Sequence, residues 1–201
     1  MTLVSAIARG NRFSRAVLIA LAAATWTPAL TSASLAASDR PASYVRTVTK
    51  EIMAAVRSGS PYTMANVIRR HGDLPDISLY SLGSYRKGLP SSRRTSFYDG
   101  VARFMARYFV AQSKHYPVAK IEVMTPSSRA DWGHKVDSRF TLRNGDTYTV
   151  RWLVVRRGKG YKVRDASLLG FWLTPFQKRL FEDYIDEHGG KVTALLAVLG
   201  S

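Results

Sequence analysis

The sequence contains no cysteine. This absence excludes a disulfide scaffold, a thiolate nucleophile, and zinc or iron–sulfur sites built on cysteine ligands. It does not fix the redox compartment. The sequence also lacks the HExxH pair of zinc proteases, the GxSxG nucleophile elbow, the P-loop and the GxGxxG dinucleotide fingerprint. These absences remove several large enzyme classes.

Acidic residues are scarce. The 201-residue chain has 14 Asp and Glu against 30 Lys and Arg, a formal charge of +16. Such a balance favours an anionic partner: nucleic acid, a membrane surface or an acidic ligand. Hydrophobic residues make up 46% and charged residues 22%, which is typical of a globular protein and excludes general disorder. The length fits one domain or two small ones.

Long apolar runs are also missing. The N-terminal run, residues 16–24, has nine apolar residues and would cover roughly 14 Å as a helix, about half of a bilayer core. Residues 1–36 have no acidic residue, three arginines before the run, and Ser34 and Ala36 at the −3 and −1 positions of a cleavage site. This order predicts a secretory signal peptide at 1–36 rather than a short membrane anchor.

Residues 37–201 are then expected to form one exported domain. Removing the three leader arginines leaves 27 basic against 14 acidic residues, a charge of +13. Export argues against nucleic acid as a partner. It favours a membrane surface or an anionic small molecule outside the cytoplasm.

The first half of this domain has helical spacing. We expect helices over residues 44–56, 62–70 and 73–85, and a longer helix that Ser91 or Ser92 caps. The longer helix carries an apolar stripe of Phe97, Val101, Phe104, Met105 and Tyr108. A stripe of this kind either packs on a core or lines a ligand cavity, and the sequence leaves both readings open.

From residue 120 the period changes to two. Strands are expected at 121–123, 135–142, 148–154 and 161–165, with Asn144-Gly145 as a hairpin turn. One face is apolar and the other is basic, so the basic face either meets anionic headgroups or is an ordinary solvated surface. The apolar face comprises Val136, Phe140, Tyr148, Val150, Trp152 and Val163. Helices at 174–188 and 192–199 complete the domain.

The pattern predicts an α+β fold. We expect N-terminal helices, a curved antiparallel sheet of about four strands, and C-terminal helices that enclose an apolar pocket, as in an NTF2-like cone. Amphipathic periodicity is the same for a filled core and for a ligand pocket, so the sequence does not distinguish them.

Catalytic candidates are few. The four histidines form no close ligand pair, and His71-Gly72-Asp73 is expected to be a solvent-facing turn. Asp165 lies on the strand alternation that carries Tyr161 and Val163, which suits either a general base or a carboxylate that bonds backbone groups. We expect the second role, and therefore no catalytic residue, no metal site, no cofactor and no enzymatic activity.

A family resemblance appears at the last strand. The run YKVRDASLLGFW, residues 161–172, resembles the W-x-V-x-D-x-x-x-x-G ending of the MlaC family, the toluene-tolerance auxiliary proteins. The segment ISLYSLGSY, the segment LPSSRR before the aromatic helix, and the order of the remaining elements also resemble that family. The resemblance extends over about residues 44–199.

This resemblance implies a periplasmic phospholipid-binding protein. Such a protein is the soluble component of an ABC-type system that moves lipid between the outer and inner membranes. The implied partners are phospholipid, an inner-membrane ABC transporter complex, an outer-membrane lipoprotein complex and, transiently, a membrane surface. The candidate walls of the lipid pocket are the two apolar sets above together with Trp172.

Three alternatives stay open. One is a hopanoid-associated carrier of the same superfamily. The second is an NTF2-like enzyme in which Asp165 and a histidine form an acid–base pair. The third is a secreted basic adaptor that binds membranes or polyanions through its Lys and Arg face.

Overall fold

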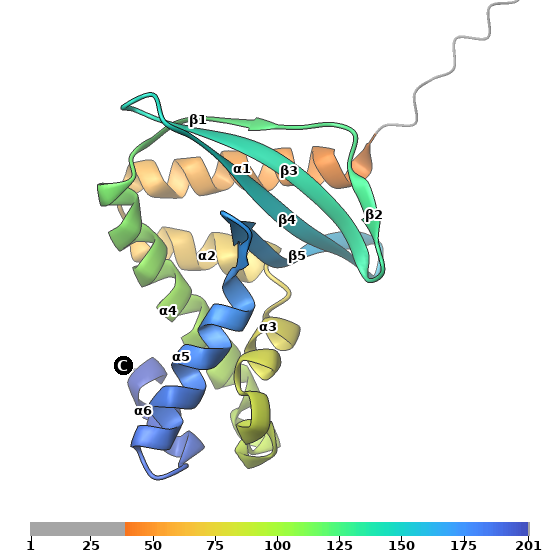
Figure 1. Cartoon of the computed structure of the whole chain (residues 1–201). Helices are drawn as coiled ribbons and strands as arrows, with labels where there is room; N and C mark the ends of the chain where they lie inside the picture. The colour runs from red at the N-terminus through yellow and green to blue at the C-terminus, as the bar shows by residue number, and fades with distance from the viewer. Residues whose placement is uncertain (1–38, 201) are drawn as a thin grey trace, which may run out of the picture. The chain divides into compact units, whose positions relative to one another are not determined.

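The computed structural model describes residues 39–200, so the proposed signal peptide lies outside the described residues. The helices are α1 (Arg40–Ser58), α2 (Pro61–His71), α3 (Leu74–Ser81), α4 (Arg94–His115), α5 (Leu173–Glu187) and α6 (Val192–Gly200), with 3₁₀ turns η1 (Gly83–Gly88) and η2 (Ser91–Arg93). The strands are β1 (Val118–Val123), β2 (Ser128–Ala130), β3 (Gly133–Leu142), β4 (Thr147–Arg157), β5 (Gly160–Leu168) and β6 (Phe171–Trp172). Helices therefore precede and follow an antiparallel sheet, which confirms the predicted α+β class (Figure 1).

Side-chain caps mark the start of helices α1 and α2, and a glycine marks the end of α1. The Asp39 carboxylate accepts the Ala42 N–H at 3.0 Å, and the Ser60 hydroxyl accepts the Thr63 N–H at 3.3 Å. Each helix therefore has a side-chain cap for an otherwise unpaired N–H group. Gly59 ends α1 in the left-handed conformation, at φ 62°. Both helices agree with the sequence prediction to within a few residues.

The segment between α2 and α4 differs from its prediction. A single helix was expected over residues 73–85, but α3 ends at Ser81 and Gly83, at φ 51°, leads into the 3₁₀ turn η1. The prediction that a serine caps α4 is also wrong. Ser91 and Ser92 lie in η2, and the N-cap residue of α4 is Arg93, whose side chain makes no capping hydrogen bond.

The six strands form one sheet in the order β1-β3-β4-β5-β6, with β2 paired to β3. All neighbouring strands are antiparallel. The four strands that the sequence predicted correspond to β1, β3, β4 and β5. The two additional strands have three and two residues, too few to show an alternation in the sequence.

Cross-strand register shows which side chains share the apolar face. Directly opposed residues lie on the same face of a sheet. The rows on the apolar face are Ile121–Phe140–Tyr148, Val123–Ser138–Val150–Leu168, Val136–Trp152–Ala166 and His134–Val154–Val163. The predicted alternation along β3 and β4 is therefore confirmed.

Helix α1 covers one end of this face. Val45 and Val48 of α1 pack with Val136, Trp152 and Val154 of the sheet, and all five are buried. Figure 1 shows α1 running behind β3 and β4. Burying these side chains stabilises the domain by about 1.5–3 kcal/mol for each large one. This end of the sheet is a filled core.

Helix α4 packs in two cores, and its predicted stripe belongs to one of them. Phe97 and Val101 are buried against α5 and α6, where Phe181 and Leu195 belong to the same cluster. A different side of α4 packs on α2 through small residues, including Ala106. The stripe is therefore a structural core at the N-terminal half of α4.

The α2–α3 junction corrects one sequence expectation. His71 and Asp73 are buried, whereas a solvent-facing turn was expected. The Nε2 atom of His71 lies 3.1 Å from a carboxylate oxygen of Glu51, and the Asp73 carboxylate pairs with Arg157 at 2.6 Å. The Asp73 N–H also bonds the Val163 carbonyl oxygen at 2.8 Å. The turn is buried because it pairs with the edge of β5.

The opposite face of the sheet is polar. Arg151 donates two hydrogen bonds to the Asp137 carboxylate, at 2.7 and 2.8 Å. This bidentate contact lowers the pKa of Asp137 from its ordinary value.

Among residues 39–200, no helix is long and apolar enough to span a bilayer.

Candidate functional site

The apolar face of the sheet is not covered along its whole length. Beyond the rows that α1 buries, Phe140, Tyr148 and Val150 remain half-buried, and Leu168 is exposed. Phe140 and Tyr148 are opposed across β3 and β4, and Val150 is opposed to Leu168 across β4 and β5. These four side chains form an open apolar surface at the β3–β4 turn end of the sheet.

The C-terminal end of α4 lies beside this open end. The Arg143 N–H, just past β3, bonds the Pro117 carbonyl oxygen at 2.9 Å, two residues after α4 ends. On the side of α4 that carries Phe97, exposure rises toward this point: Phe97 is buried, Phe104 is half-buried, and Tyr108 is 45% exposed. The half of α4 nearest the open sheet therefore has uncovered aromatic rings.

Helix α5 borders the surface on another side. Its Thr174 N–H bonds the Asp165 carboxylate at 3.0 Å, which fixes the start of α5 to β5. One flank of α5 carries Glu182, which accepts the Ser84 N–H of η1 at 3.1 Å. Helical spacing puts Phe176, Leu180 and Tyr184 on the opposite flank, away from η1. Phe176 and Leu180 are exposed and Tyr184 is half-buried.

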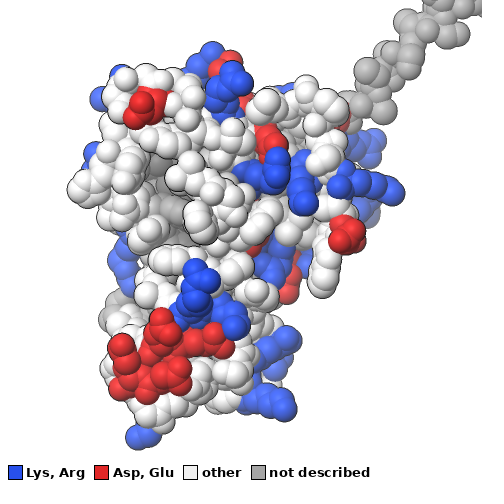
Figure 2. All heavy atoms as spheres, viewed as in Figure 1, with Lys and Arg blue, Asp and Glu red and all other residues white. Residues whose placement is uncertain are grey.

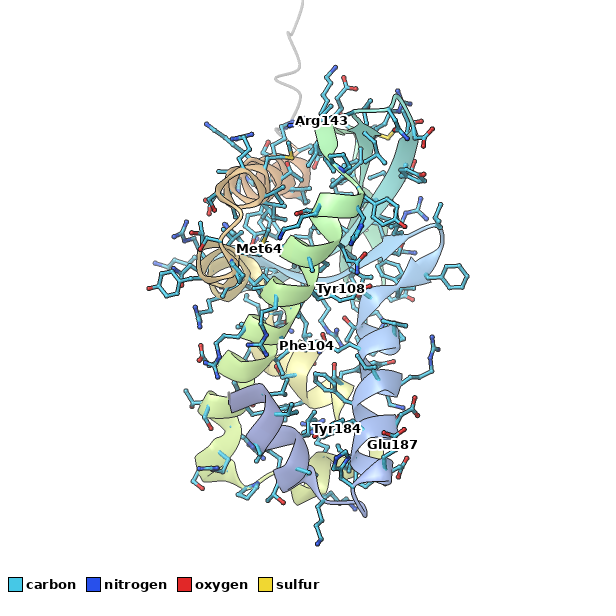
Figure 3. All side chains as sticks on the ribbon, turned by 90° about the vertical axis from the view of Figure 1, so that its left-hand side faces the viewer. Met64, Phe104, Tyr108, Arg143, Tyr184 and Glu187 are labelled. Atoms are coloured by element: carbon cyan, nitrogen blue, oxygen red, sulfur yellow. The ribbon has the colours of Figure 1, made fainter. Side chains whose placement is uncertain are left out.

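The space between α4 and α5 closes at Phe104. Its ring meets the ring of Phe181 on α5 edge to face, with centroids 5.4 Å apart. Figure 3 shows Phe104 and Tyr108 extending from α4 into the space between α4 and α5, with Tyr184 lower on α5. Figure 2 shows a hollow on this side of the molecule. We call the surface bounded by Phe104, Tyr108, Phe140, Tyr148, Val150, Leu168, Phe176 and Leu180 the apolar groove.

The structure brings only part of the predicted wall to this groove. Five predicted residues border it, and the others lie in filled cores or on another face. The five are Phe104, Tyr108, Phe140, Tyr148 and Val150. The core residues are Phe97, Val101, Val136 and Trp152, and Met105 and Val163 pack against those cores. Phe104, Phe140 and Val150 also pack against the cores, so they lie between a core and the groove. Trp172 is opposed to Ser167, in the row of Arg151, so the register places it on the other face.

Three groove residues were missing from the sequence prediction. Phe176 and Leu180 lie four residues apart on α5, a helix that was not part of the predicted wall. Leu168 is out of phase with the alternation of Tyr161 and Val163, and it reaches their face only because of a register shift between Leu153 and Val154. The same shift places Asp165 opposite Leu153, on the other face. The i, i+4 spacing on α5 was the signal that could have found two of the three.

Asp165 has a structural role. Its carboxylate accepts the Ala166 N–H at 2.8 Å as well as the Thr174 N–H. Burial raises the pKa of Asp165, and these backbone hydrogen bonds oppose that rise. Within residues 39–200, the hydrogen bonds of the Asp165 carboxylate are to Ala166 and Thr174. Within residues 39–200, no three His, Asp or Glu side chains group as metal ligands.

Comparison with known proteins shows the family. The chain matches the family described as MlaC protein over residues 47–201, more than half of its length. The chain belongs to the MlaC family. This match includes the groove and all the helices and strands from α2 onward. No curated protein matches the chain significantly.

A solved structure has the same fold. It is a phospholipid-binding protein from Ralstonia solanacearum, determined in complex with a phospholipid. It superimposes with a TM-score of 0.64 at 20% sequence identity, covering 80% of this chain and 94% of that chain. The likeness shows that the fold of this MlaC family member is that of a phospholipid-binding protein.

Proposed function

We propose that this chain is a periplasmic phospholipid carrier that holds acyl chains in the apolar groove. One observation carries the proposal: Phe140, Tyr148 and Val150 form an apolar sheet surface that stays half-buried at the edge of the core that α1 forms with the sheet. A soluble domain normally covers such a surface, so a ligand with apolar chains is a suitable occupant. The family and the phospholipid-bound neighbour support the same ligand.

Acyl chains would provide most of the binding energy. Each buried CH₂ contributes about 0.8 kcal/mol, so one 16-carbon chain contributes roughly 12 kcal/mol before ordering costs. An exposed ion pair to a headgroup contributes about 0–1 kcal/mol. The apolar walls therefore set affinity, and the positive surface of the protein has its main effect on docking.

The proposal extends to export and partners. Residues 1–36 are removed as a signal peptide, and the mature chain moves lipid between the outer and inner membranes. It delivers to or receives from an inner-membrane ABC transporter complex and an outer-membrane lipoprotein complex, with transient membrane contact. It is a binding protein and not an enzyme, and it carries phospholipid as cargo without a cofactor. Family membership and the basic composition support this role.

Native mass spectrometry tests the proposal directly. The chain is exported by its own leader, purified without detergent, measured intact and then extracted with solvent. The expected result is an added mass that resolves as phospholipid, on a chain that begins at residue 37. A hopanoid mass would place the protein in the related branch. Protein that is free of lipid and takes up none from added phospholipid would contradict the carrier function.

A further inference from the structure

The β5–β6 hairpin holds two large apolar side chains in water. Leu169 is 68% exposed and Phe171 is 75% exposed. Leu169 also has a left-handed backbone, at φ 53°, a conformation that glycine or asparagine adopts far more easily. The loop geometry alone therefore gives no reason for a leucine at this position.

These two residues continue the rim of the groove. Phe171 is opposed to Leu168 across β5 and β6, and Leu168 is opposed to Val150 of the groove. Phe176 and Leu180, also exposed, follow on α5. We call the set Leu168, Leu169, Phe171, Phe176 and Leu180 the mouth patch. Contiguous exposed patches of this kind mark interaction sites in soluble proteins.

Charge is distributed unevenly around the mouth patch. Arg179, which is exposed, directly precedes Leu180. The acidic residues of α5 begin at Glu182 and Asp183, just after Leu180, and continue to Glu187, which is about 17 Å along the helix from Phe176. Figure 2 shows the acidic side chains gathered at the lower end, with Lys and Arg between them and the hollow. Lys178 and Arg179 thus lie between Phe176 and the acidic residues of α5, on a chain with a formal charge of +16.

We infer that the mouth patch docks on an anionic phospholipid bilayer, with Leu169 and Phe171 inserted into the headgroup region. Apolar side chains bordered by cations are the combination that binds such surfaces reversibly. The hairpin carries no charged side chain from Leu168 to Trp172, so insertion desolvates no charge there. This inference rests on the proposed function, because it would bring the opening of the groove against the acyl chains that the groove receives.

Because the chain has no cysteine, single-cysteine variants give a direct test. Leu169→Cys is labelled with a polarity-sensitive fluorophore and mixed with phosphatidylglycerol–phosphatidylcholine vesicles. Trp132→Cys is the matched control. Trp132 is 82% exposed, and it adjoins Gly133 at the end of the sheet where β5 begins, about 30 Å from the hairpin along β5.

The expected result is a blue shift with a several-fold gain in emission at position 169 and none at position 132. A shift at position 132 alone, or at neither position, would overturn the inference. A shift at position 169 with detergent-solubilised inner-membrane protein but not with vesicles would also overturn it, because the hairpin would then dock on a protein.

Vesicle co-sedimentation gives a second readout with different variants. Leu169→Gln combined with Phe171→Gln should weaken binding at least about tenfold, while Trp132→Gln should leave it unchanged. Phospholipid content is measured on the same preparations. If lipid is present in all of them but the hairpin variant binds vesicles as the wild type does, the inference fails and the carrier function stands. Lipid-free wild-type protein would instead contradict the carrier function.

Discussion

Phe104 on α4 and Phe181 on α5 meet edge to face, with ring centroids 5.4 Å apart. Phe181 is buried in the core that α4 shares with the C-terminal helices, whereas Phe104 is half-buried at its edge. One turn further along α4, Tyr108 is 45% exposed. The Phe104–Phe181 contact therefore separates a filled core from the open groove.

The position of Phe104 predicts a cost in stability when its ring is removed. Phe104→Ala should lower the free energy of unfolding by about 2–4 kcal/mol, because the ring packs on Phe181. Urea unfolding of the lipid-free protein measures the change. Tyr108→Ala, one turn further along α4, is the control and should cost about 1 kcal/mol or less. Equal costs for the two variants would show that the core does not end at Phe104.

The indole of Trp152 depends on Ser138. Its N–H bonds the Ser138 hydroxyl at 2.7 Å in the buried sheet face, and that hydroxyl lies 3.2 Å from the Val150 carbonyl oxygen. Ser138→Ala would leave a buried N–H unpaired, which costs about 1–3 kcal/mol. Ser128→Ala, on an exposed strand residue, should change the unfolding midpoint little. If Ser138→Ala left the free energy of unfolding unchanged, the indole would have found another partner.

Asp165 predicts a pH dependence of stability. Because burial raises its pKa in the folded state, folding favours the protonated acid. Its contribution is therefore most favourable below its ordinary pKa and is lost as pH rises through the raised value. Relative to Asp165→Asn, which does not titrate, the wild type should gain stability as pH falls from 7 to about 4. Denaturant unfolding of both proteins at the two pH values measures this difference.

The same variant tests the acid–base alternative. Asp165→Asn keeps a carbonyl oxygen that can accept the Thr174 N–H, so it should retain bound phospholipid. Loss of an enzymatic activity with lipid content unchanged would favour a catalytic role instead. A stability difference that is the same at both pH values would contradict the raised pKa.

The sequence predicted the sheet better than the groove. Alternation along β3 and β4 identified the face of Val136 and Val150 correctly, because one-sided burial leaves a period of two. The same alternation does not reveal that α1 covers Val136 and leaves Val150 half-buried. That difference depends on where a helix far away in the chain packs, so a filled core and a groove have the same local pattern.

Two further differences have local causes. His71 was expected in solvent because His-Gly-Asp is a common turn composition, but pairing of the turn with β5 buries it. Trp172 was expected on the wall because it is large and apolar. Its neighbour Phe171 is the residue that the β5–β6 register places in the row of Leu168 and Val150, which a two-residue strand does not reveal in sequence.

The central claim is that phospholipid occupies the groove beside Val150. The most direct test compares Val150→Glu with Thr149→Glu, adjacent residues of β4 on opposite faces. Both proteins are purified without detergent, and bound phospholipid per chain is measured by mass spectrometry. A carboxylate in the groove cannot be solvated by acyl chains, whereas one on the outer face stays in water. We predict that Val150→Glu loses its lipid while folded and that Thr149→Glu keeps it. Full lipid content in a folded Val150→Glu protein would contradict the account.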